Sequence, residues 1–283
     1  MVKFYNLWIA IPDSSISDEQ TKRDKSIKVS QFARACSIFR VNKIYIYHDK
    51  TSRIDNKDND ILKTILRYLD TPQYLRRTLY PHMPQLQYAG ILHPIKAPHH
   101  KKFENTKRIK MGEVRVGVFV KLKGTNYVDI GLDALVPYEG NDRTVGEKLN
   151  VRIVSSYPDL KAKEATPGDF KNHYWGYEVK EVPNLRELLQ ETKKTKIIIT
   201  SRNGSNFQSK ENKLINHLND ISNLLVVFGA PKKGVDEILA SEGQSIRQFD
   251  FVVNMFPFQG TETVRLEEAI LGTLSILNYV IFK

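Results

Sequence analysis

Three segments in the C-terminal half of the chain carry residue types that suit ligand-binding loops, and each follows a short apolar run. They are residues 200–204, 228–234 and 254–263. Glycine lets another molecule approach the main chain closely and proline presets φ, so loops of this composition can offer backbone groups to a ligand. In parallel α/β sheets ligands bind at the carboxyl ends of strands, which predicts that the three loops face one crevice.

The third loop also has a plainer interpretation. Thr261 can cap the helix that follows it, and Glu262 and Glu267 fall in or near the first helical turns, where the helix dipole favours carboxylates. Taken alone, residues 254–268 are explained equally well as an ordinary strand-to-helix connection.

Several other chemistries are disfavoured by spacing. Residues 229–234 lack the four-residue spacing and the Lys-Ser/Thr ending of a P-loop, and no Gly-x-Gly-x-x-Gly follows Ile11. The histidines have no cysteine partners at zinc spacing, so no metal site is expected. The single cysteine, Cys36, lies in an apolar helical pattern and is expected to be a buried, inert thiol.

The net charge of the chain is +11, which makes a polyanion the first partner to consider. The segment from Lys96 to Lys123 contains nine basic residues and two acidic ones. This basic run indicates a surface that binds a polyanion, or else an ordinary solvated surface. One cysteine permits no internal disulfide, and the apolar stretches 7–11 and 269–282 are too short for a signal peptide or a membrane span. These features favour a cytoplasmic protein that does not contact a membrane.

Hydrophobic periodicity indicates an α/β protein that is interrupted in its middle. Strands are expected at residues 6–11, 43–47, 196–200, 224–228 and 249–253. Helices are expected at residues 27–39, 61–69, 74–80, 185–190, 210–219 and 235–240, and a further helix ends the chain. Between them, β-like runs at 113–121, 127–136, 149–155 and 174–179 predict a small β-barrel, with the OB-fold as the leading candidate.

An OB-fold commonly binds single-stranded nucleic acid with aromatic rings and a cationic groove. The basic run lies at the leading edge of this predicted barrel. Aromatic residues that could stack on bases are Tyr127, Tyr138, Tyr157, Tyr174, Trp175 and Tyr177. For any single one of them, a place in the barrel core is the better expectation.

Taken together, a set of motifs resembles the SPOUT class of S-adenosylmethionine-dependent RNA methyltransferases, in a branch with an OB-like insertion. The resemblance covers nearly the whole chain. The motifs are residues 28–35, 38–41, 71–77, 88–94, 175–177, 228–234 and 259–269.

The resemblance implies a knotted parallel sheet with a C-terminal trefoil knot and an inserted OB-like RNA-binding domain. The methyltransferase domain would be discontinuous, at 1–86 and 176–283, and the insertion would span 87–175. It further implies a homodimer, ribosomal RNA as substrate, and uridine N3 as the methylated atom. Residues expected to bind S-adenosylmethionine are Thr200, Ser201, Arg202, Phe228, Gly229, Ala230, Pro231, Gly234, Asn254, Phe256, Pro257, Gln259, Gly260, Thr261, Thr263 and Val264.

Catalysis at uridine N3 requires removal of a proton and stabilisation of the negative charge that develops. The candidates are Arg34 and Arg23 for the charge and Glu262 for the base. Arg34 could equally contact phosphate, and Glu262 is explained better by the helix dipole. Residues expected to bind RNA are Lys101, Lys102, Lys107, Arg108, Lys110, Arg76 and Arg77.

Two departures from the family pattern leave a second function open. Lys25 and Ser26 stand where relatives carry an asparagine, and Ala230-Pro231 replaces an acidic residue of the glycine-rich loop. The alternative to an RNA methyltransferase is a non-catalytic RNA-binding or ribosome-assembly factor that retains the fold.

Overall fold

The computed structural model describes residues 6–52, 56–170, 173–192, 195–218 and 223–281. The chain divides into two compact units. Unit 1 consists of Met1–Arg67, Pro84–Pro94 and Gly176–Lys283, and unit 2 consists of Tyr68–Met83 and Ile95–Trp175. Residues 68–83, which the sequence placed with the α/β domain, belong to unit 2 because Leu75 packs against Val116 and Val118.

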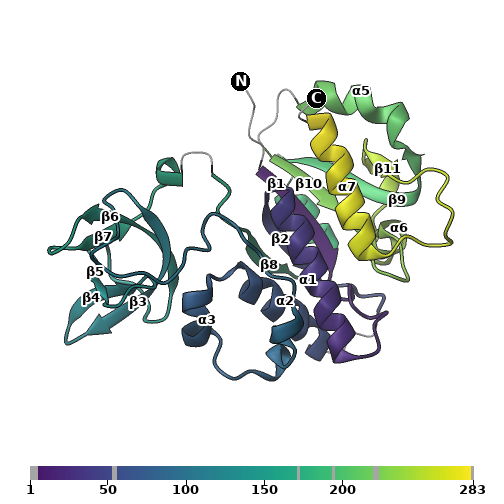
Figure 1. Ribbon diagram of the computed structural model, residues 1–283. Coiled ribbons are helices and arrows are strands. Elements are labelled where there is room, and N and C mark those ends of the chain that lie inside the picture. Colours follow the sequence, from purple (N-terminus) through teal and green to yellow (C-terminus); the bar gives the residue numbers. More distant parts are fainter. Residues whose placement is uncertain (1–5, 53–55, 171–172, 193–194, 219–222, 282–283) are drawn as a thin grey trace. The chain divides into compact units, whose positions relative to one another are not determined.

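Unit 1 is built on a six-stranded sheet in the order β11-β9-β10-β1-β2-β8, and every pairing in it is parallel (Figure 1). The strands are β1 (Asn6–Pro12), β2 (Val41–Tyr47), β8 (Glu178–Val182), β9 (Lys196–Asn206), β10 (Asn223–Val227) and β11 (Val252–Asn254). The central strands β1 and β10 read as continuous apolar runs because helices cover both faces of a parallel sheet.

The helices of unit 1 pack on both faces of this sheet. They are α1 (Lys22–Ile38), α2 (Asn56–Asp70, whose last residues belong to unit 2), α4 (Leu185–Glu191), α5 (Phe207–Leu218), α6 (Val235–Ser241) and α7 (Leu266–Ile281). Short 3₁₀ turns lie at Pro84–Leu86, Ala89–Ile91 and Ile246–Gln248. Figure 1 shows α7 beside α1, and the two helices are in contact.

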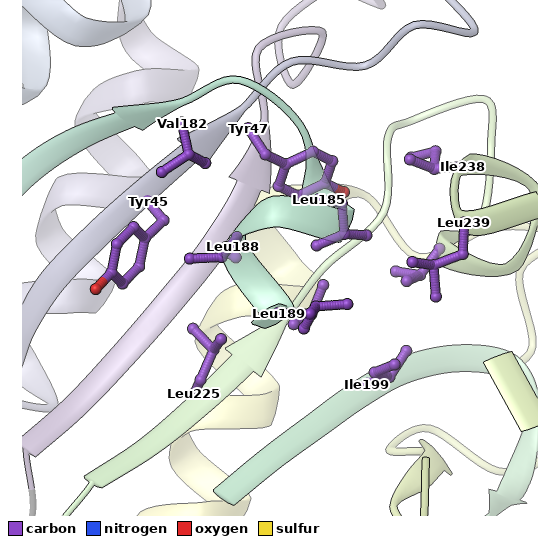
Figure 2. Packing of buried hydrophobic residues seen from close by; sticks show 13 residues of the cluster. Tyr45, Tyr47, Val182, Leu185, Leu188, Leu189, Ile199, Leu225, Ile238 and Leu239 are labelled. Carbon is purple, nitrogen blue, oxygen red and sulfur yellow. The ribbon is translucent and has the colours of Figure 1, made fainter. Parts of the chain in front are cut away.

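Alternate residues of each strand point to opposite faces, which gives two buried layers. Tyr45 and Tyr47 of β2 pack with Leu225 of β10 against leucines of α4 and α6, as Figure 2 shows. Ile44 and Ile46, the intervening residues of β2, are buried on the other face.

Unit 2 is a five-stranded antiparallel sheet in the order β5-β4-β3-β6-β7. The strands are β3 (Val114–Leu122), β4 (Thr125–Asp129), β5 (Val136–Pro137), β6 (Lys148–Ser155) and β7 (Lys161–Glu164), with helix α3 (Gln73–Leu79) and a 3₁₀ turn at Pro167–Phe170. A parallel bridge between Tyr138 and Ala162 joins the two edge strands, so the sheet closes on itself. Its interior is filled by residues such as Phe119, Val128 and Ile153.

Several sequence expectations require correction. The strand expected at 127–136 is two strands, because Gly131 adopts a positive φ of 75° where an added Cβ would overlap the ring of Tyr74. The strand expected at 174–179 lies at Glu178–Val182 instead. β7 was missed because Ala162 is its one buried residue, so it shows no apolar alternation.

The start of α7 also differs from expectation. The helix begins at Leu266, so Thr261 is not its cap and Glu262 lies outside it. The Thr261 hydroxyl instead donates to the Thr263 carbonyl over 2.9 Å. Among the residues that the structure describes, no helix has the length and apolar character needed to span a membrane.

Candidate active site

A cavity of about 270 Å³ lies in unit 1, beside a bulge in β9 and the segments that follow β10 and β11. Its walls come from three segments, residues 200–203, 228–237 and 254–264, together with the first turns of α7. Of the residues expected to bind a cofactor, thirteen line it: Thr200, Ser201, Arg202, Phe228, Gly229, Ala230, Pro231, Gly234, Asn254, Phe256, Gln259, Thr263 and Val264. Pro257, Gly260 and Thr261 do not line it.

The first wall is a bulge inside β9. Val252 of β11 pairs with Ile199, but the next residue, Val253, pairs with Ser205. Residues 200–204 therefore leave the ladder, and residues 200–203 line the cavity. The bulge ends at Gly204, and pairing with β11 resumes at the next residue. A Cβ on Gly204 would lie 2.8 Å from the backbone of Val253, so only glycine fits this close approach.

The second wall is the turn after β10. Ala230 N donates to Lys233 O over 2.9 Å, and Lys233 N donates back to Ala230 O over 3.4 Å. The turn is anchored from behind, because the buried Tyr47 hydroxyl donates to Phe228 O over 2.6 Å and Lys233 Nζ donates to Thr51 O over 2.7 Å. These contacts fix the backbone that faces the cavity.

The third wall, residues 254–264, is bonded to the first. Asn254 Nδ2 donates to Arg202 O over 3.0 Å, and Arg202 Nη1 donates to Glu262 O over 3.0 Å. Gln259 Nε2 donates to Thr261 O and Glu262 O, over 2.9 and 3.2 Å. Asn254, Gln259 and Arg202 thus hold the loop in shape, which explains why this polar segment needs no regular secondary structure.

A buried ionic cluster fixes the point where this loop enters α7. Lys28 of α1 is 2% exposed, and its Nζ lies 2.6 Å from Asp18 and 3.2 Å from Glu267. Arg265 pairs with Glu19 and, over 2.8 Å, with Glu267. Removing one member of a buried pair leaves an uncompensated charge, so the cluster holds α7 against α1.

The lining combines apolar surface with a few polar groups, which is the usual composition of a small-molecule site. Phe228, Met255 and Phe256 supply apolar contact, and Arg202 and Asp236 supply charges of opposite sign. Lining residues that were not among the expected cofactor contacts are Asn203, Lys232, Lys233, Val235, Asp236, Glu237, Met255, Leu266, Ala269 and Thr273. Asp236 and Glu237 follow Gly234 in the first turn of α6, a position that could have signalled them.

One buried hydroxyl of the lining has no hydrogen-bond partner in the described part of the chain. Thr273 of α7 is fully buried, and its hydroxyl makes no hydrogen bond there. A buried hydroxyl without a partner is costly, so a ligand group that forms a hydrogen bond with it would be favoured. The cavity therefore suits an organic ligand with both apolar and hydrogen-bonding parts.

The three catalytic candidates lie outside this cavity. Arg34 Nη1 donates to Pro94 O over 3.1 Å, and the Arg23 side chain is 62% exposed, 3.8 Å from Asp24. Glu262 is exposed, and its carbonyl takes part in the loop bonding described above. The chain alone therefore does not bring them together with the cavity lining. Among the described residues no group of three or more His, Cys, Asp and Glu is placed to hold a metal ion.

A second polar surface lies on unit 2, on residues 101–110, here called the basic arm. Lys101, Lys102, Lys107, Arg108 and Lys110 are all exposed, whereas Ile109 is buried in the barrel core. The arm is fixed to the barrel by the buried Arg115, which donates to Lys102 O over 2.9 Å and pairs with Glu104 over 2.9 Å.

Arg76 and Arg77 of α3 differ from each other. Arg76 is half-buried, donates to the carbonyls of Thr71 and Leu69, and lies over the ring of Tyr68 at 4.5 Å. Arg77 is exposed. Arg76 therefore has a structural role in the loop after α2, and only Arg77 is available to a partner.

Comparison with known proteins decides the family. Residues 6–277 match the family described as "Putative RNA methyltransferase". The chain belongs to this family. The match confirms the resemblance to RNA methyltransferases that the motifs had indicated.

Two proteins with sequences similar to this chain are named "28S rRNA (uridine-N(3))-methyltransferase". The one from Drosophila melanogaster is 29% identical over 311 residues, which cover 96% of this chain and 61% of the relative. The one from Homo sapiens is 29% identical over 302 residues, which cover 97% of this chain and 78% of the relative. A solved structure of a methylase family protein from Neisseria gonorrhoeae covers 98% of this chain and 82% of its own, at 11% identity and a TM-score of 0.38, which is too low to bear on the fold.

Proposed function

We propose that this chain transfers a methyl group from S-adenosylmethionine to a base of ribosomal RNA, with uridine N3 as the acceptor atom. The observation that carries the proposal is the alignment of almost the whole chain with relatives named as uridine-N3 methyltransferases of 28S rRNA. The cavity lined by residues 200–203, 228–237 and 254–264 supports it independently, because it offers a built small-molecule site in the same unit.

The lining residues suit S-adenosylmethionine. Backbone groups of residues 228–230 and 254–256 would bind its polar atoms, while Phe228 and Phe256 would cover its apolar surface. Asp236 and Glu237 place negative charge where a sulfonium or an ammonium group is favoured, and Arg202 can pair with a carboxylate. The bound donor supplies an electrophilic methyl group.

The remaining chemistry falls to the chain's own residues. Transfer to uridine N3 forms a nitrogen–carbon bond while the N3 proton leaves, so negative charge develops on the base. An arginine near the base would stabilise that charge. Arg34 and Arg23 remain the candidates for this role, and Glu262 remains the candidate base. The target uridine must be unpaired or flipped out to enter the site.

A homodimer would explain how catalytic candidates that lie outside the cavity of their own chain could still act at a cofactor site. α1 and α7 pack together, and the two helices carry exposed apolar side chains, among them Ile38, Leu271 and Tyr279. A second copy seated there would cover these side chains. It would also bring Arg34 of one copy toward the cavity of the other, as the family resemblance implies.

The finer features of the fold are part of the proposal. β11 pairs at the edge of the sheet beside β9, yet α7 directly after it packs on α1, which connects β1 and β2. Residues 255–265 must therefore cross the ends of β9 and β10 near the turn 228–234. We assign this crossing to the trefoil knot of a SPOUT methyltransferase, a rare exception to unknotted topology.

Unit 2 would be the inserted OB-like domain that grips RNA. When β3 to β7 are counted as strands 1 to 5, neighbouring strands follow the order 3-2-1-4-5 and strand 3 meets strand 5 again through the Tyr138–Ala162 bridge. This closed arrangement is that of an OB-like Greek-key barrel. The basic arm would contact phosphates. Arg77 of α3 would add a further phosphate contact. The number of phosphates that these cations neutralise would set the salt dependence of RNA binding.

The test is cofactor calorimetry followed by methyl transfer to RNA from cells that lack this protein, with the modified nucleotide mapped. The proposal expects binding of S-adenosylmethionine and methylation of a uridine at N3 in the large-subunit RNA. Binding of the cofactor and of RNA without any transfer would favour the non-catalytic assembly factor. No cofactor binding would overturn the placement of the site.

A further inference from the structure

The structure distinguishes among the aromatic residues that could stack on RNA. Tyr138 and Tyr174 are buried, and Trp175 is held by a 2.8 Å hydrogen bond from its Nε1 to Asn150. Tyr157, by contrast, is 51% exposed. It lies in the loop 156–160 between β6 and β7, the fourth and fifth strands of the barrel, and in OB-folds this loop borders the nucleic-acid face.

A cation of the basic arm lies against this ring. Lys107 Nζ is 5.6 Å from the ring centroid of Tyr157. The segments next to the arm and the loop are bonded to each other: Gly112 N, just after the arm, donates to Ile153 O of β6 over 2.8 Å, and Ile153 N donates to Glu113 O over 2.9 Å. An exposed aromatic ring and an ammonium group thus lie together on the surface of unit 2.

The arm cations differ from three other basic residues of the barrel. Lys121, Arg143 and Arg152 each pair with a carboxylate within 3.3 Å. In the described residues, no such ion pair is formed by the five exposed cations of the basic arm. A row of unpaired cations is available to phosphates, because no internal carboxylate has to be displaced. A protein partner would need complementary acidic and apolar surface, whereas a nucleic-acid strand supplies a phosphate at every step.

We propose that Tyr157 is a stacking platform for an unpaired RNA base, and that Lys107 beside it contacts the phosphate of the stacked nucleotide. Base–aromatic stacking needs a base whose face is free, so the occupant is single-stranded RNA and not a duplex. The inference rests on the proposed function, since it specifies how unit 2 grips the substrate of that reaction.

The test uses the full chain and a short fluorescein-labelled oligouridylate, either single-stranded or annealed to oligoadenylate. The variants are Tyr157→Ala, Tyr157→Phe and the control Val145→Ala, which removes another exposed apolar side chain of unit 2. Tyr157→Ala should weaken single-strand binding by a factor on the order of 5 to 150, the range that base stacking commands. Tyr157→Phe and Val145→Ala should bind like the wild type, and duplex binding should not respond to Tyr157→Ala.

Salt dependence separates stacking from charge. Tyr157→Ala should lower affinity equally at low and high salt, whereas Lys107→Ala should reduce the slope of log K against log salt by about one. Unchanged binding by Tyr157→Ala, or an equal loss with Tyr157→Phe, would overturn the stacking role. If the wild-type chain does not bind the oligouridylate at all, the RNA-binding part of the proposed function fails together with it.

Discussion

Gly229 offers the sharpest perturbation of the proposed cofactor site. A Cβ at this position would lie 2.8 Å from Lys233 O and 3.1 Å from Val235 N. Both contacts are with backbone, and the turn is closed by the paired Ala230 and Lys233 hydrogen bonds, so it cannot yield without losing them. Overpacking of this kind costs about 1–3 kcal/mol. Because Gly229 lines the cavity, much of that distortion falls on the ligand-facing backbone.

Gly229→Ala should therefore weaken S-adenosylmethionine binding by a factor on the order of 5 to 150, the equivalent of that energy. The matched control is Gly260→Ala, because nothing lies within 4 Å of the added Cβ and Gly260 does not line the cavity. Isothermal titration calorimetry measures both affinities, and far-UV circular dichroism with thermal unfolding verifies that both variants fold. If Gly229→Ala loses stability but binds the cofactor like the wild type, the turn 228–234 is not a wall of the binding site.

Three further outcomes follow from single contacts. Tyr47→Phe removes the buried bond to the Phe228 carbonyl and should cost about 1–3 kcal/mol in chemical denaturation, with weaker cofactor binding; unchanged values would remove Tyr47 as an anchor of the turn. Burial opposes ionisation of Asp70, but hydrogen bonding and charge from His99 and Lys148 outweigh it and lower the pKa of this carboxyl below 3.8. The ionised carboxylate therefore stabilises the fold above about pH 3.8, and this stabilisation is lost as the pH falls through the lowered pKa. Asp70→Asn should have a lower free energy of unfolding than the wild type at neutral pH, and the difference should shrink in acid. A difference in unfolding free energy that does not change with pH would contradict this. Replacing Lys101 and Lys102 together by alanine should reduce the salt slope of RNA binding by about two; an unchanged slope would make that part of the arm an ordinary solvated surface.

The alternation of strands and helices was enough to predict most of unit 1 and the common edge of its loops. Residues 228–234 could be placed correctly because a glycine- and proline-rich turn after a buried strand has few other structures open to it. The bulge at 200–204 could not be predicted, since it exists only because Val253 pairs with Ser205 of a strand distant in sequence. For the same reason the sequence ended β9 at residue 200, although the strand continues to Asn206.

Side-chain roles depended still more on tertiary contacts. Thr261 has the residue type of a helix cap, but the bonds from Arg202 and Gln259 to the Glu262 carbonyl keep the segment out of the helix. Tyr138 and Tyr157 are indistinguishable in sequence, and only the closed barrel buries the first and exposes the second. Local patterns thus indicated where the ligand-facing backbone lies, and long-range pairing determined which side chains accompany it.

Methyl transfer itself tests the central claim most directly. Ribosomal RNA from cells lacking this protein is incubated with the full chain and S-adenosylmethionine labelled in its methyl group, with the Gly229→Ala and Gly260→Ala variants in parallel. We expect label at uridine N3 in large-subunit RNA with the wild type and with Gly260→Ala, and a much lower yield with Gly229→Ala at limiting cofactor. Cofactor binding without any label in RNA, or equal yields from all three proteins, would contradict the assignment of the cavity as the site of methyl transfer.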